Sequence, residues 1–118
     1  MTVTLDGKTL DVLHLGESAD PVQVQWDAWE NSAYKRKVKV YGLVRRWSLN
    51  CVEKEVAWAS SQAKSFQESA GAGTTVTFQV TDQVRIVDTN VKILHVGLNV
   101  ADLAGKNVRR FSLTLQEV

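Results

Sequence analysis

The side chains best suited to catalysis are few and widely separated along the chain. There is a single cysteine, Cys51, and there are two histidines, His14 and His95. The histidines do not form a His-x-x-x-His pair, so a metal site would require them to meet across the fold together with a carboxylate. Cys51 falls on the apolar face of a predicted strand, which indicates a buried structural thiol rather than a nucleophile.

The acidic residues and the glycine-rich segment also lack a catalytic arrangement. Glu53 and Glu55 lie in the first turn of a predicted helix, where negative charge is favourable, and the remaining acids are scattered. The segment Gly71–Thr75 follows that helix and precedes a strand, which is the reverse order of a phosphate-binding loop, and it contains no lysine. We therefore predict that the protein is not an enzyme and holds no cofactor or metal.

Positive charge and aromatic residues are concentrated between residues 34 and 47. On a strand, alternate lysines would present a positive face suited to phosphates, and the aromatic rings would stack on bases. The same lysines would also protect an edge strand from aggregation. Binding of single-stranded nucleic acid through this segment is therefore one alternative function.

Four tryptophans are a high number for a chain of 118 residues. Trp26 continues an alternating apolar pattern and is predicted to lie in the core. Trp29 lies in a polar segment and Trp58 beside the stripe of a predicted helix. Both suit anchors of a protein interface or a platform for carbohydrate, although both would also suit the ends of a small β-core. Carbohydrate binding is thus a second alternative.

Apolar and polar residues alternate along most of the chain, which is typical of half-buried strands. Asp6-Gly7 predicts the turn of an N-terminal hairpin over residues 2–15. A long strand is expected from Tyr34 to Cys51, and its apolar face changes near Gly42, which indicates a bulge or bend. We also expect three segments outside the strands: a loop over His14–Pro21, a polar connection over Asp27–Ala33 and a turn over Ala104–Asn107.

One segment changes to helical spacing. Apolar residues from Val52 to Ala70 recur at intervals of three and four, which predicts one amphipathic helix over about residues 53–70. The chain is thus expected to be a single α+β, mainly β domain over residues 1–118. We predict an antiparallel β-sandwich or barrel of seven or eight strands with the helix inserted mid-chain.

Composition and charge narrow the class of partner. The chain is 44% hydrophobic and 23% charged, with 14 basic and 13 acidic residues, so its net charge of +1 creates no strong field toward nucleic acid or membrane. The N-terminus has no signal-peptide pattern, and no apolar run approaches the roughly 20 residues of a membrane helix. We expect a virion or cytoplasmic location and no membrane partner.

Two strand motifs carry a family resemblance. Gly42–Leu49 follows the pattern G-x-x-R-x-W-x-L, and Arg109–Glu117 follows R-x-F-x-L-x-L-x-E, with one helix between them. This order, over about residues 34–118, resembles small β-rich subunits of phage tails and contractile injection machines, of the tail-tube, distal-tail or baseplate type. The resemblance implies ring assembly without catalysis. The chain shows no obvious long assembly arm, so the hairpin over Thr2–Val12 is expected to take that role.

These observations favour a non-enzymatic structural subunit that self-assembles or docks into a larger protein complex, such as a phage-tail-like ring or tube. Its expected partners are further copies of itself and other assembly proteins. The predicted mechanism is pairing of strand edges together with burial of aromatic anchors between subunits. The interface candidates are Trp29, Arg45, Arg46 and Trp58.

Overall fold

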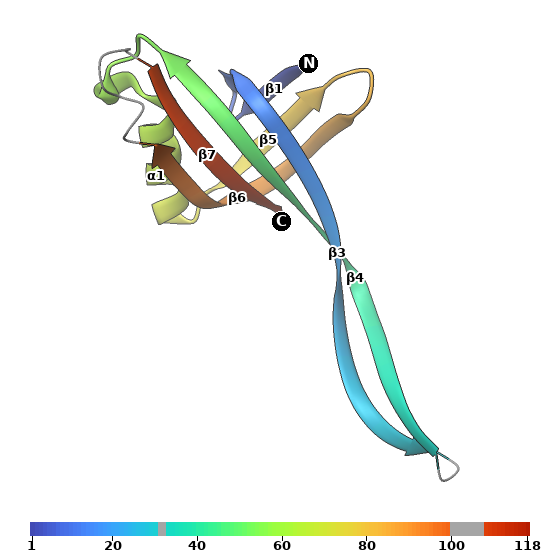
Figure 1. Ribbon diagram of the computed structural model, residues 1–118. Helices are drawn as coiled ribbons and strands as arrows, with labels where there is room; N and C mark the ends of the chain where they lie inside the picture. The colour runs from blue at the N-terminus through green and yellow to red at the C-terminus, as the bar shows by residue number, and fades with distance from the viewer. Residues whose placement is uncertain (31–32, 100–107) are drawn as a thin grey trace.

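The computed structural model describes residues 1–30, 33–99 and 108–118, and most of them lie in long β-strands (Figure 1). The strands are β1 (Thr2–Leu5), β2 (Lys8–Leu10), β3 (Val12–Glu30), β4 (Ala33–Lys54), β5 (Thr75–Thr81), β6 (Ile86–Asn99) and β7 (Val108–Glu117). A 3₁₀ turn over Trp58–Ser60 and the helix α1 (Gln62–Ala72) lie between β4 and β5. No helix in the described residues is long and apolar enough to cross a bilayer.

All seven strands belong to one antiparallel sheet in the order β2-β1-β5-β6-β7-β4-β3. The prediction of a mainly antiparallel β fold with one mid-chain helix is confirmed. Figure 1 shows the β5–β6 half of the sheet crossing the β4–β7 half at a large angle, with α1 against one end. Among the described residues the edge strands β2 and β3 do not pair with each other, so closure into a barrel is not observed.

The core lies on the inner face of this curved sheet. Trp47 packs against Phe78 with 5.2 Å between ring centroids, and Phe66 of α1 packs against Phe111 at 6.3 Å. The strands contribute to this core at every second residue, as in Val76, Phe78 and Val80 of β5, because successive side chains of a strand point to opposite faces. The helix contributes two buried residues, Ala63 and Phe66.

The helix is shorter than the sequence predicts. It begins at Gln62 rather than near residue 53, because Val52 and Glu53 continue β4 and the backbone turns at Glu55, which has a positive φ of 56°. The helical spacing between residues 52 and 59 was therefore coincidental. The end of the helix follows the prediction, since Gly73 adopts the left-handed conformation that terminates helices.

The first turn and the long strand follow the sequence. Asp6 and Gly7 both have positive φ, as a two-residue hairpin turn requires, and the hairpin ends at Leu10. The pairing of β3 with β4 shifts between Val22 and Gln23, opposite Gly42, so the predicted bulge is confirmed. The turn expected over Ala104–Asn107 lies outside the described residues.

Three expectations about β3 and the segment that follows it are wrong. Residues 14–21 form no loop but part of β3, where Pro21 is tolerated because β3 is an edge strand and one side of it needs no N–H donor. Trp26 is not in the core but is 46% exposed, because β3 and β4 continue beyond the body of the sheet. The polar connection expected over Asp27–Ala33 is likewise mostly strand.

The largest correction concerns the assembly arm. The hairpin of β1 and β2 pairs with β5 inside the sheet, so it does not project. Instead β3 and β4 extend from the body as one long two-stranded ribbon (Figure 1). This ribbon gives the molecule dimensions of 69 × 31 × 25 Å. The alternating pattern of these residues predicted a strand of the core, whereas the structure shows a projecting ribbon.

Candidate assembly surface

The projecting part of the β3–β4 ribbon is defined by where β4 loses its second neighbour. The pairing of β4 with β7 ends at Arg46, so residues 19–30 and 33–45 pair only with each other. We call these residues the arm. At about 3.3 Å per residue, twelve residues of strand extend roughly 40 Å.

The arm contributes nothing to the core and exposes many apolar side chains. All residues of the buried cluster lie outside it. Among the described residues, nine of the 17 exposed large apolar side chains lie on the arm, although the arm forms less than a quarter of the chain. They are Val22, Val24, Trp26, Trp29, Tyr34, Val38, Val40, Tyr41 and Leu43. Since a two-stranded ribbon is at best marginally stable alone in water, such a surface is typical of a segment that packs against a partner.

The two faces of the arm differ in charge. On one face, Val24 and Trp26 lie opposite Lys39 and Lys37, and Ala28 lies opposite Lys35. We call Val22, Val24, Trp26, Ala28, Lys35, Lys37 and Lys39 the lysine face. On the other face, glutamines of β3 lie opposite Val38 and Val40, and Asp27 pairs with Arg36 at 3.4 Å.

The tip of the arm holds an aromatic pair. Trp29 is 74% exposed, and its ring meets that of Tyr34 edge to face with 5.8 Å between centroids. A hydrogen bond with Asp27 raises the pKa of the Tyr34 hydroxyl, so Tyr34 remains neutral. Trp29 therefore lies one residue before the end of β3, and its role as an interface anchor stays a prediction.

The base of the arm is fixed to the body by charged groups. Glu17 accepts hydrogen bonds from Trp47 Nε1 at 3.1 Å and from two nitrogens of Arg85, on the β5–β6 turn, at 2.6 and 3.0 Å. The Arg85 guanidinium holds the pKa of Glu17 below its ordinary value. Arg45 pairs with Glu117 and lies over the Trp47 ring at 5.3 Å.

The four predicted interface residues do not form one patch. Trp29 lies at the tip of the arm, and Arg45 and Arg46 lie at its base, where Arg46 donates to Gln116 at 3.0 Å. Trp58 lies in the 3₁₀ turn before α1, 43% exposed, with the Arg109 guanidinium 5.2 Å above its ring. The exposed apolar residues of the arm include Trp26, which was expected in the core.

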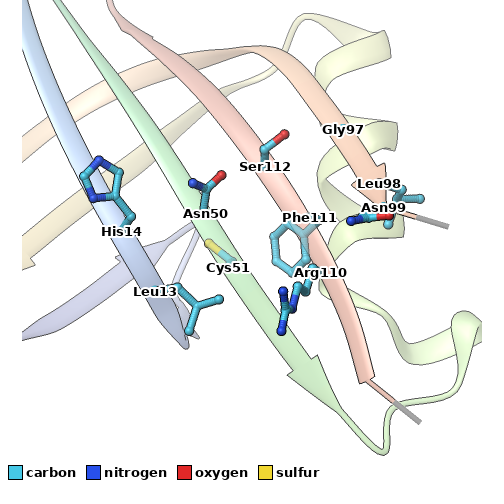
Figure 2. A pocket seen from close by; sticks show the side chains of 10 residues that line it. All are labelled: Leu13, His14, Asn50, Cys51, Gly97, Leu98, Asn99, Arg110, Phe111 and Ser112. Carbon is cyan, nitrogen blue, oxygen red and sulfur yellow. The ribbon is translucent and has the colours of Figure 1, made fainter. Parts of the chain in front are cut away.

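The two histidines and Cys51 lie on three different strands, β3, β6 and β4. His14, Asn50 and Ser112 lie opposite one another on the outer face of β3, β4 and β7, whereas Cys51 points to the inner face and is buried (Figure 2). Burial raises the pKa of the Cys51 thiol to about 12. His95 lies on β6 beside a second register shift.

A hollow of about 520 Å³ lies around His14 and Cys51 (Figure 2). Its described lining residues combine apolar side chains with amides, a hydroxyl and one arginine, and none of them carries a carboxylate. Among the residues that the structure describes, no group of three His, Cys, Asp or Glu side chains is placed to hold a metal ion.

Comparison with known proteins gives matches among solved structures. No protein-family model and no curated protein matches the sequence. A chain in the structure of the virion of a native gene transfer agent particle matches with a TM-score of 0.61 and 15% identity, over 99% of this chain and 89% of that one. A chain in the structure of the tail of an empty gene transfer agent particle matches with a TM-score of 0.58 and 15% identity, over 94% and 81%.

The chain shares the fold of these particle chains. The resemblance to phage-tail subunits, which the sequence indicates through its two strand motifs, is therefore confirmed at the level of the fold. The matches extend over nearly the whole chain, whereas the sequence resemblance begins near residue 34. Residues 1–33 carry no motif of their own, so only the three-dimensional structure connects them to the fold.

Proposed function

We propose that this protein is a non-enzymatic structural subunit of a virion, which assembles with further copies of itself into a phage-tail-like ring or tube through its arm. The observation that carries the proposal is the arm itself. It projects from a folded body, contributes nothing to the core and exposes apolar side chains on both faces. Other assembly proteins would join the ends of such a ring or tube.

The arm is large enough to form a stable interface. Two faces of about 40 Å by 10 Å offer about 800 Å², which is the area that one partner contributes to a standard protein interface. Its tip residue Trp29 has the size and rigidity of an anchor that fills a pocket. Burial of the arm, rather than pairing of the sheet edges, is the main contact that we propose. Edge pairing is less suited because β2 has only three residues and Pro21 interrupts β3.

The similar solved structures support the same proposal. Both are chains of gene transfer agent particles, and the structure of the tail was refined with C6 symmetry. A six-membered ring is therefore the arrangement to test for this chain. In such a ring every arm would pack against an equivalent neighbouring subunit, so that no arm would remain exposed.

The proposal is tested by measuring mass in solution with light scattering behind a sizing column, over a wide range of protein concentration. The wild-type chain is expected to form a discrete ring or a growing tube. The arm variant Val24→Ser/Val40→Ser is expected to remain monomeric, because it loses apolar contacts on both faces without touching the core. The matched control Val118→Ser, which also removes an exposed valine but lies at the C-terminus, should assemble normally. A wild-type chain that is monomeric at every concentration refutes the proposal.

A further inference from the structure

The turn between β5 and β6 is the most exposed apolar point of the body. Val84 is 90% exposed and Ile86 is 71% exposed. Asp82 and Asp88 flank them, and Asp88 lies on the same face of β6 as Ile86, two residues along the strand. We call Asp82, Val84, Ile86 and Asp88 the turn patch.

The turn patch carries net negative charge. Its one basic residue, Arg85, is paired with Glu17 of β3, at 2.6 and 3.0 Å, and so leaves the charge of the two aspartates unbalanced. Asp82 accepts from the backbone N–H of Gln83 at 2.7 Å, and Asp88 accepts from Gln79 at 3.4 Å. Within the described residues, no Lys or Arg forms an ion pair with either aspartate.

The lysine face of the arm has the opposite character. Residues 19–45 contain five basic and three acidic residues, while the rest of the chain contains nine basic and ten acidic residues. On the other face of the arm Asp27 pairs with Arg36, whereas the lysine face carries three basic residues, Lys35, Lys37 and Lys39, and also Asp20 near the base of the arm. Beside these lysines runs an apolar row that includes Val24 and Trp26, both about half exposed.

The two surfaces are complementary in chemistry. The lysine face places apolar side chains beside lysines, and the turn patch places Val84 and Ile86 beside two aspartates. The lysine face near the tip cannot reach the turn patch of its own chain, because the arm leads away from the body (Figure 1). We propose that the lysine face docks on the turn patch of a second copy of the chain.

This inference rests on the proposed function and names the site that receives the arm. The contact joins two different surfaces, so it is head to tail, and it builds a ring where the rotation closes or a filament where it does not. The other exposed apolar site on the body, Val56 and Trp58, is a poorer receptor, because the Arg109 guanidinium covers Trp58.

Charge reversal with rescue tests the proposal. The arm variant Lys37→Glu/Lys39→Glu and the turn variant Asp82→Lys/Asp88→Lys each bring like charges together at the contact. Each is expected to raise the protein concentration needed for half-assembly at least tenfold. The chain that carries all four substitutions restores opposite charges and is expected to return to within about threefold of wild type. The control Asp11→Lys/Glu68→Lys reverses two acids elsewhere on the body and should leave assembly unchanged.

The outcomes separate this inference from the proposed function. If the turn variant assembles like wild type, or the fourfold variant assembles no better than the arm variant, the turn patch does not receive the arm. The proposed function then stands provided that Val24→Ser/Val40→Ser still blocks assembly. If the lysine substitutions disturb the turn, as circular dichroism would show, Asp82→Asn/Asp88→Asn repeats the test with a smaller expected effect. An arm variant that assembles normally but loses binding to a single-stranded oligonucleotide would assign the lysine face to nucleic acid instead.

Discussion

Glu53 connects the end of β4 to the start of α1. Its carboxylate is 3% exposed and accepts hydrogen bonds from Ser61 Oγ at 2.9 Å and from the backbone N–H groups of Gln62 and Ala63 at 3.1 Å each. It therefore satisfies donors at the helix N-terminus that have no partner within the helix. Arg109 lies behind it at 3.7 Å, with one nitrogen, Nη1, buried and lacking a hydrogen-bond acceptor.

We expect Glu53→Gln to lower the free energy of unfolding by about 2 kcal/mol, because an amide accepts through one oxygen only and leaves the buried Arg109 without a counter-charge. Urea denaturation of the monomeric arm variant Val24→Ser/Val40→Ser measures this without interference from assembly. Glu68→Gln, at an exposed site on α1, is the control and should stay within about 0.5 kcal/mol. Equal effects at the two positions would show that the buried carboxylate has no special role.

Cys51 is expected to be unreactive toward thiol reagents in the folded protein. Burial raises its pKa from 9.0 to about 12, so at pH 8 the nucleophilic thiolate is almost absent in the native state but present at an appreciable fraction once the chain unfolds. A thiol reagent at pH 8 should therefore label Cys51 only at the rate of unfolding, and urea should accelerate the labelling. The folded state also prefers the neutral thiol, so this contribution to stability declines as the pH rises above about 9 and the unfolded chain ionises. Rapid labelling without denaturant would contradict the buried position.

Among the elements, the arm depends on one glycine. Gly42 lies opposite the register shift in β3 with a φ of +150°, and a Cβ built there meets no atom within 4 Å. Any cost of a side chain is therefore a backbone cost, of about 1 kcal/mol or more. We expect Gly42→Ala to destabilise the arm and to weaken assembly, measured by light scattering.

Gly71 is the matched control for that substitution. It lies in α1, where a Cβ also meets no atom within 4 Å and no positive φ is required. Gly71→Ala should therefore raise the free energy of unfolding, by about 0.5 kcal/mol, and leave assembly unchanged. If both alanines weaken assembly to the same extent, the bulge at Gly42 is not the reason.

The strands could be predicted from the sequence, but whether the apolar face of each strand is buried or exposed could not. Alternation in Val76, Phe78 and Val80 and in Val22, Val24 and Trp26 has the same form, yet the first set is buried and the second is exposed. An alternation of apolar and polar residues indicates that a strand has two different faces. It does not indicate what covers the apolar face. The core of the body was therefore predictable, whereas the arm was mistaken for more core.

The candidate site was predicted in part for the same reason. Trp29 was identified because its neighbours are polar, and the structure places it at the tip of the arm. The apolar rows of the arm were missed because an exposed apolar row has the same residue types in sequence as a buried one. A combination that was available in the sequence is the row of lysines opposite an apolar row, which is unusual for a core strand. Its meaning required the register of β3 with β4.

For the whole molecule, the decisive quantity is its extension in solution. The radius of gyration is 19.0 Å, whereas a compact domain of this length has about 13.5 Å, because the arm places about a fifth of the chain far from the centre of mass. We expect small-angle X-ray scattering from the monomeric variant Val24→Ser/Val40→Ser to give a radius near 19 Å. A value near 14 Å would mean that the arm folds back onto its own body. Its apolar rows would then be covered by the same chain, and the need for a second copy, on which the proposed assembly depends, would disappear.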